Sequence, residues 1–168
     1  MAIDNQFIQT KLTEKFGDMV SNFDESYGML SFEAPKEQNL KVLQYLFDEP
    51  TLGFQFLTDL CAVNYPDDIG RELAVVYHLH NLAENTRIRF KVFTSIDNTD
   101  VFTASKLHAS ADWMERETYD FYGVNFVGHH NLKRILNVDE MDYFPLRKEY
   151  PLEDQTRIDK DDEMFGRG

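Results

Sequence analysis

Apolar residues at four-residue steps predict a short amphipathic helix over residues 5–16. Two extended segments, 19–24 and 29–33, follow on either side of a turn at residues 26–28, which is the pattern of a hairpin. The helix is expected to cover the sheet that this hairpin begins. The residues that define the helix face are Ile8, Leu12 and Phe16.

The central part of the chain predicts one more helix and at least two strands. Apolar residues recur at three and four positions over 36–48, so a helix is expected there, ended by Pro50. Residues 54–64 have mixed periodicity that fits a strand or a short helix. Strict alternation over 72–79 and 87–93 predicts the clearest hairpin of the sequence. Its buried face is formed by Leu73, Val75, Tyr77, Leu79, Ile88, Phe90 and Val92.

The last helix expected from the pattern begins at Ser110 or Asp112, either of which could cap it, and ends at Gly123. The polar segment 97–112 before it and the residues after Gly123 have little periodicity. Residues 139–168 hold ten acidic and five basic side chains, too many to form a core alone. These features predict an α/β domain of the α+β type, with a mainly antiparallel sheet covered by helices. We expect the domain at residues 1–126 and a loop with an extended, partner-ordered tail at 127–168.

The charge of the chain excludes several classes of ligand. It carries 30 acidic and 17 basic residues, a net charge of −13, which opposes binding to nucleic acid or to an anionic membrane. No apolar run approaches the ~20 residues that span a bilayer, and no secretory signal is visible, so a cytoplasmic location is expected. The single Cys61 excludes an internal disulfide, a zinc-thiolate cluster and a four-cysteine iron–sulfur centre.

One segment of the sequence is specific enough to indicate a family. It reads ERETYDFYGVNF from Glu115 to Phe126 and HHNLKRIL from His129 to Leu136, followed by PLRKEYPL from Pro145. These motifs resemble the signature of the thirty-kilodalton, C-type subunit of NADH:quinone oxidoreductase (respiratory complex I). The chain departs from the family pattern at His130, where a proline is common.

The resemblance implies a cofactor-free, non-catalytic scaffold in the peripheral arm of complex I. Its partners would be the large, D-type subunit and the iron–sulfur subunits of that arm, and it would reach the cytoplasmic side of the cell membrane only through them. NADH, flavin, iron–sulfur clusters and quinone would be bound by the assembled complex. Related subunits occur in membrane-bound hydrogenases and in dehydrogenases driven by ferredoxin or deazaflavin, and the sequence leaves that alternative open.

The motif residues are expected to form a charge-linked joint between the helix, the loop and the tail. Acidic groups of the helix removed from water need counter-ions, and Lys133, Arg134 and Arg147 are the candidates. The full set expected at the partner interface is Glu115, Arg116, Glu117, Asp120, His129, Lys133, Arg134, Pro145, Leu146, Arg147 and Lys148.

Other interpretations of the same residues compete with this one. Glu117 and Asp120 could act as an acid–base pair in a stand-alone hydrolase, although a salt-bridged or solvated helix face is commoner. His78 and His80, which share a strand face, could bind a metal together with His108, His129 and His130, but their spacing fits no familiar zinc pattern. Aromatic residues near the signature could line a quinone pocket, whereas core packing or partner contact is commoner. Cys61 is interpreted as a buried apolar residue rather than a reactive thiol.

Overall fold

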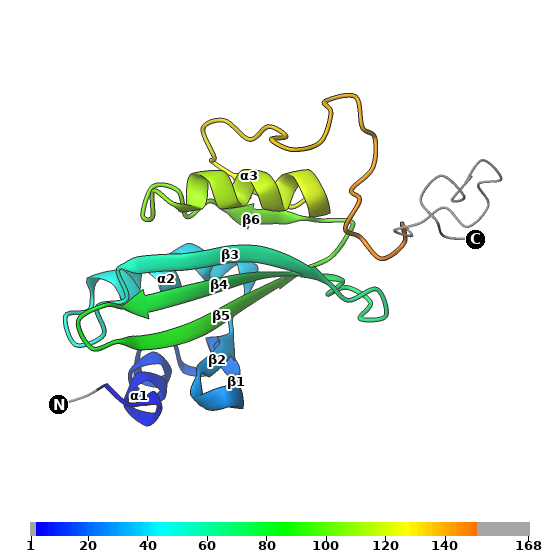
Figure 1. The fold of residues 1–168 in the computed structure, drawn as a ribbon. Helices are drawn as coiled ribbons and strands as arrows, with labels where there is room; N and C mark the ends of the chain where they lie inside the picture. The colour runs from blue at the N-terminus through cyan, green and yellow to red at the C-terminus, as the bar shows by residue number, and fades with distance from the viewer. Residues whose placement is uncertain (1–2, 151–168) are drawn as a thin grey trace, which may run out of the picture.

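The computed structural model describes residues 3–150, which fold around a five-stranded sheet with helices packed against it (Figure 1). The predicted fold class, a mainly antiparallel sheet covered by helices, is confirmed. Residues 151–168, most of the expected tail, lie outside the described residues. In chain order the helices and strands are α1 (Asn5–Phe16), β1 (Ser21–Asp24), β2 (Leu30–Glu33), α2 (Asn39–Asp48), β3 (Phe56–Asn64), β4 (Leu73–Asn81), β5 (Thr86–Thr94), β6 (Asp100–Phe102), α3 (Ala111–Tyr122) and β7 (Asn125–Val127).

The strands of the large sheet lie in the order β1-β2-β5-β4-β3. The three pairs β1/β2, β5/β4 and β4/β3 are antiparallel, and β2/β5 is parallel. The β4/β5 hairpin has the alternation that the sequence predicts, with Leu79 opposite Ile88 and Tyr77 opposite Phe90. The segment 54–64, left open between strand and helix, forms the edge strand β3.

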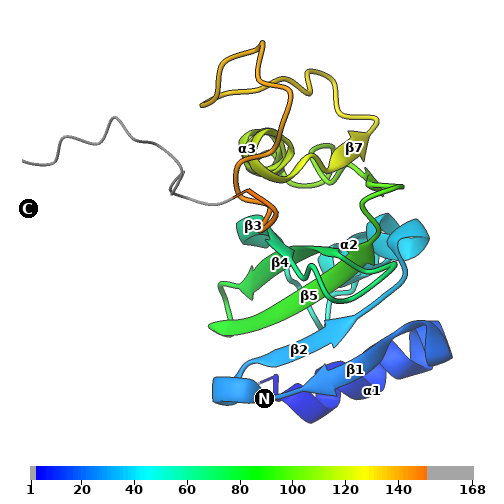
Figure 2. The ribbon, with the colours of Figure 1, turned by 90° about the vertical axis from the view of Figure 1, so that its right-hand side faces the viewer.

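The core lies between this sheet and the helices α1 and α2, which occupy the same side of it (Figure 2). All three residues of the predicted α1 face are buried. Across the sheet, Phe32, Phe90 and Tyr77 stack in a row, with ring centroids 5.1 and 5.3 Å apart. Each such aromatic pair contributes about 0.5–1.5 kcal/mol beyond the area that it buries.

A second, two-stranded sheet forms where the sequence predicts no strand. β6 and β7 pair in parallel, with Val101 opposite Phe126, and both of these side chains are buried. Between the two strands in sequence lies α3, which packs beside the edge strand β3 (Figures 1 and 2). The two strands thus form in segments where the sequence has little periodicity, and residue 126, the end of the expected domain, lies within β7.

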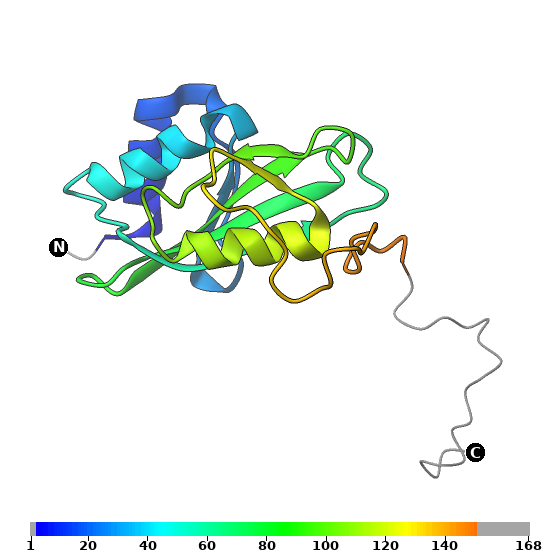
Figure 3. The ribbon, with the colours of Figure 1, turned by 90° about the horizontal axis from the view of Figure 1, so that it is seen from above.

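After β7 the chain runs back over α3 without forming another helix or strand within the described residues (Figure 3). Loops longer than about 12–15 residues without secondary structure are uncommon in compact domains and are usually functional loops or linker segments. Among residues 3–150, no helix combines the length and apolar character needed to cross a bilayer.

Candidate functional site

The carboxylate of Asp120, fully buried on α3, is the anchor of the loop that follows β7. Its Oδ2 atom accepts hydrogen bonds from the main-chain N–H groups of Ile135, Leu136 and Asn137 at 3.0, 2.8 and 3.0 Å. Its Oδ1 atom accepts from the side chains of Arg134 and Asn137 at 2.8 and 3.0 Å. Successive N–H groups that converge in this way form an anion-binding concavity, here filled by the protein's own carboxylate.

Arg134 connects three segments of the chain. One guanidinium nitrogen, Nη1, donates to the carboxylate and the main-chain carbonyl of Asp120, both at 2.8 Å. The other, Nη2, donates to the carbonyls of Met141 and Tyr143 at 2.9 and 3.0 Å. The expected joint between helix and loop is thus formed by Arg134.

The return part of the loop is fixed by Phe144, a residue that no sequence pattern marked. The guanidinium groups of Arg134 and Arg147 both contact its ring, at 5.2 and 4.6 Å from the ring centre. Arg147 Nε also donates to the carbonyl of Tyr122 at 2.8 Å. These contacts place the second motif directly on the end of α3, at Gly123.

Gly123 is required at this junction for two reasons. It ends α3 in the left-handed conformation, with φ of 75°, which favours glycine. A Cβ atom there would also lie 2.5 Å from the Phe144 ring and 2.7 Å from Arg147 Nη2. The close packing of the loop on the helix end therefore depends on the absence of a side chain.

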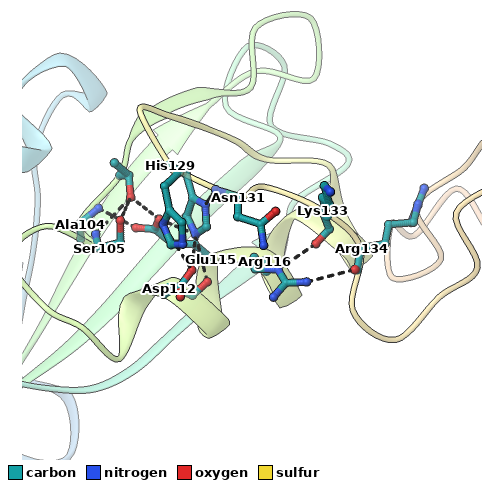
Figure 4. A network of polar contacts seen from close by, with 11 residues as sticks. Ala104, Ser105, Asp112, Glu115, Arg116, His129, Asn131, Lys133 and Arg134 are labelled. Atoms are coloured by element: carbon teal, nitrogen blue, oxygen red, sulfur yellow. Dashed lines mark hydrogen bonds and ion pairs between the residues drawn. The ribbon is translucent and has the colours of Figure 1, made fainter.

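A second buried carboxylate, Glu115, lies earlier on α3 and belongs to the network shown in Figure 4. Its Oε2 atom accepts from the Thr103 hydroxyl at 2.5 Å, and its Oε1 atom accepts from the Ala104 N–H at 2.6 Å. His129 Nε2 lies 3.9 Å from Oε2. Glu115 thereby links α3 to the segment that follows β6.

The two buried carboxylates differ in their proton affinity. Burial raises the pKa of Glu115 to about 7, because its two hydrogen bonds only partly offset the loss of hydration. Burial also opposes ionisation of Asp120, but hydrogen bonds from Asn137, Leu136 and Arg134 outweigh it, so the pKa of Asp120 lies well below its ordinary value. The acids of this helix face are in part salt-bridged and in part solvated, since Asp120 pairs with Arg134 and Glu117 is exposed.

His129 and its neighbours form the arrangement closest to a metal site in residues 3–150. Ligand atoms of Asp112, His129 and His130 lie within 4.8 Å of one another. However, the main-chain N–H of Asn131 donates to His129 Nδ1 at 3.0 Å, so the proton of a neutral ring is on Nε2, the atom that faces Asp112 at 3.0 Å. A metal on Nε2 would need that nitrogen unprotonated, which conflicts with this tautomer. The arrangement suits a histidine whose Nε2–H donates to the main-chain carbonyl of Asp112 at 3.1 Å. His108, the third histidine considered, packs instead against Phe47.

Other residues of the two motifs lie at the base of the loop. Arg116 donates from Nε to the carbonyl of Lys133 at 3.2 Å and from Nη2 to that of Arg134 at 3.4 Å, and it stacks on Trp113. The Lys148 N–H donates to Asn64 Oδ1 on β3 at 2.8 Å. Pro145 is half-buried, and Leu146 is exposed.

Lys133 and Arg147, two of the expected counter-ions, do not pair with the acids of α3 in the part of the chain that the structure describes. Within residues 3–150, the exposed Lys133 side chain forms no ion pair with the acids of α3, and the carboxylate nearest to Arg147 is that of Glu149, at 3.8 Å.

Ser110 forms no side-chain cap, because its hydroxyl donates to the carbonyl of Leu57. Cys61 is half-buried rather than buried, and burial raises the pKa of its thiol.

The contacts of these carboxylates link α3 to the neighbouring segments of the chain. Asp120 accepts five hydrogen bonds and Glu115 is enclosed, so neither carboxylate faces an open cleft. Glu117, the supposed partner of Asp120 in acid–base catalysis, points to solvent. The aromatic residues near the signature do not converge on one pocket, since Trp113 is exposed and Phe126 is buried on β7.

Comparison with known proteins identifies the family of the chain. Residues 32–156 match the family described as "Respiratory-chain NADH dehydrogenase, 30 Kd subunit". The chain is 38% identical over 152 residues to a C-type NADH-quinone oxidoreductase subunit of Rhizobium meliloti, covering 90% of this chain and 75% of that protein. It is 40% identical over 157 residues to the C-type subunit of Citrifermentans bemidjiense, covering 94% and 95%.

Two solved structures have the same fold. A trypsin-resistant fragment of Nqo5 superposes with a TM-score of 0.64 at 27% identity, over 74% of this chain and 98% of the fragment. A chain of a membrane-bound sulfane sulfur reductase, an archaeal respiratory membrane complex, superposes with a TM-score of 0.73 at 22% identity, over 88% and 85%. The family match and the relatives together show that this chain belongs to the family of the 30-kDa, C-type subunit of respiratory NADH dehydrogenase.

Proposed function

We propose that this chain is a non-catalytic, cofactor-free assembly subunit in the peripheral arm of proton-translocating NADH:quinone oxidoreductase, where it supports the quinone-reducing module. The observation that carries the proposal is the use of the signature residues. Asp120, Arg134 and Arg147 fix a long loop on α3 and leave no open acid–base pair among the residues that the structure describes. Side chains used in this way suit a protein that presents a surface to a partner.

Membership of the family supports a proposal about the partners. We propose that the chain binds the large, D-type subunit and the iron–sulfur subunits of the peripheral arm, on the cytoplasmic side of the membrane, and meets the membrane only through them. Residues 1–126 would supply the domain, and residues 127–168 most of the docking. NADH, flavin, iron–sulfur clusters and quinone would be bound by those other subunits. Relatives named as NADH-quinone oxidoreductase subunits, 38% and 40% identical, favour this complex over a hydrogenase or a ferredoxin- or deazaflavin-driven dehydrogenase.

Co-purification tests this function directly. An affinity-tagged chain would replace the untagged one in its own cells, and membranes would be solubilised gently enough to keep NADH:quinone activity. The proposal predicts recovery of the tagged chain with an NADH-oxidising flavoprotein and the large, D-type subunit, and with that activity. Recovery of the tagged chain alone, while the active complex elutes without it, would overturn the proposal.

The hydrolase interpretation has a separate test. The purified chain alone would be assayed against ester, phosphate and glycoside substrates, with Glu117→Gln as the comparison. Because Glu117 is exposed and Asp120 is fully hydrogen-bonded, we expect no turnover that depends on Glu117. Turnover that this substitution abolishes, without partner subunits, would favour the enzyme.

A further inference from the structure

We propose that the loop from Arg134 to Tyr143 is a preformed docking element, whose crest residues Leu136 and Val138 enter an apolar pocket with a basic rim on a neighbouring subunit. We call this segment the 134–143 loop. The inference rests on the proposed function, since it presupposes that neighbour, and it specifies which surface is used and what chemistry it meets.

The 134–143 loop is closed at its base by a single side chain. Arg134 starts the loop, and its Nη2 atom donates to the carbonyls of Met141 and Tyr143 on the returning side at 2.9 and 3.0 Å. Its Nη1 atom holds this base to Asp120 on α3. Inside the loop, the Met141 N–H donates to the carbonyl of Val138 at 3.2 Å. A compact surface loop with adjoining ends is an Ω-loop, a class that is frequently functional.

The backbone below the crest is held by the helix. The N–H groups of Ile135, Leu136 and Asn137 all donate to Asp120 Oδ2, at 2.8–3.0 Å. With its main chain fixed in this way, the loop holds two large apolar side chains in water, Leu136 at 66% and Val138 at 63% exposure. Because this backbone is already ordered, a partner that buries these side chains bears little of the ordering cost that a flexible loop would impose.

The charge next to the crest defines the partner. Asp139, Glu140 and Asp142 are all exposed, whereas Arg134 is engaged with Asp120 and two carbonyls. A surface that covers Leu136 and Val138 therefore meets three carboxylates at its edge. Lys or Arg on the rim of the partner's pocket would complement them, while an anionic lipid surface would repel them.

A matched pair of double variants tests the crest. Leu136→Ser with Val138→Ser removes the two apolar side chains, and Ile69→Ser with Leu82→Ser removes two of comparable exposure, 91% and 64%, from the β3–β4 and β4–β5 connections. Each tagged full-length variant would replace the wild-type chain in the cells that normally make it. The amount recovered with the solubilised complex would then be measured at increasing salt concentrations. Thermal unfolding of each purified chain, expected to match wild type, checks folding.

The proposal predicts that the crest variant loses roughly tenfold or more in association, because two apolar side chains no longer leave water on binding. The control variant should assemble as wild type does. Equal assembly of both variants would overturn this inference and leave the proposed function intact. Failure of the wild-type chain itself to assemble would overturn the proposed function.

A charge variant tests the basic rim. Asp139→Asn, Glu140→Gln and Asp142→Asn together remove the three carboxylates without changing the apolar crest. Association should weaken, and its dependence on salt should become shallower than that of wild type. An unchanged salt dependence would overturn the basic rim. Self-association of the purified wild-type chain that is lost in the crest variant would identify a second copy as the occupant and overturn the proposal.

Discussion

Asp120 and Arg134 form a buried ion pair between α3 and the following loop, with Oδ1 and Nη1 at 2.8 Å. Both side chains are almost fully removed from water, so each carries a desolvation cost that only the other and its hydrogen bonds offset. The pair therefore makes the position of the loop depend on one residue of the helix.

Asp120→Asn should release the loop from α3. Loss of one partner of a buried ion pair costs about 3–5 kcal/mol, and an amide is a weaker acceptor than a carboxylate for the three N–H groups. Hydrogen exchange should therefore accelerate at Ile135, Leu136 and Asn137 and change little in the β4/β5 hairpin. Glu117→Gln, the same kind of change at an exposed position of the same helix, is the control and should leave exchange unaltered. Equal exchange at the three amides in wild type and Asp120→Asn would contradict the anchoring role.

Glu115 should make the protein less stable as pH rises toward neutrality. Its pKa is about 7 in the folded chain against an ordinary 4.5, so between these values the folded state holds a proton that the unfolded state has lost. The stability from this group is complete below pH 4.5 and is lost as pH rises through about 7, amounting to roughly 2–4 kcal/mol. Denaturant unfolding across this range should show a flatter pH profile for Glu115→Gln than for wild type. A profile that this substitution leaves unchanged would count against a buried, protonated Glu115.

Gly123→Ala should destabilise the junction between α3 and the loop more than the same change elsewhere. Gly28 has the same φ of 75° but open space where a Cβ would lie, so Gly28→Ala measures the backbone cost alone. That cost is about 1–2 kcal/mol. At Gly123 the added methyl group also displaces Phe144 and Arg147, with a further ~1–3 kcal/mol expected. Equal losses in unfolding free energy for the two variants would show that the loop does not pack on Gly123 as described.

Trp113 reports on assembly because it is the single tryptophan of the chain and is 63% exposed. Trp and Arg are each enriched at binding hot spots, and Arg116 stacks on this ring. If α3 faces a partner, emission from Trp113 should shift to the blue in the complex. The contribution of Trp113 can be isolated by subtracting the spectrum of a complex that carries Trp113→Phe. Unshifted emission would place this side of the helix outside the interface.

Sequence patterns predicted the β4/β5 hairpin of the large sheet well because apolar residues alternate strictly along both of its strands. Leu73, Val75, Tyr77 and Leu79 are all buried in the core, as the alternation predicts, although the opposite face of β4 is largely buried as well. The sequence pattern did not reveal β6 and β7, because strands of three residues are too short to show alternation. The two strands pair with each other although α3 separates them in the sequence. Only the folded chain brings Val101 beside Phe126.

The sequence predicted which types of residue form the site, but not which acidic residue pairs with which basic one. The need of buried acids for counter-ions pointed to Arg134, Lys133 and Arg147, yet only Arg134 pairs with Asp120. Helix periodicity could not separate the buried Glu115 from the exposed Glu117. Glu115 is enclosed through contacts with Thr103 and Ala104, which lie in a segment with little periodicity. The position of Phe144 just before the second motif was a weak signal, and its contacts with two arginines could be seen only in the structure.

Hydrogen exchange of the free chain and of the chain within the assembled complex tests the central claim most directly. The claim is that α3 and the segment after it form the surface by which this protein is held. We predict strong added protection on assembly over residues 111–122 and 134–150, with unchanged exchange at residues 82–85 in the β4–β5 turn. Added protection confined to the sheet, with α3 and the 134–143 loop exchanging as in the free chain, would contradict it.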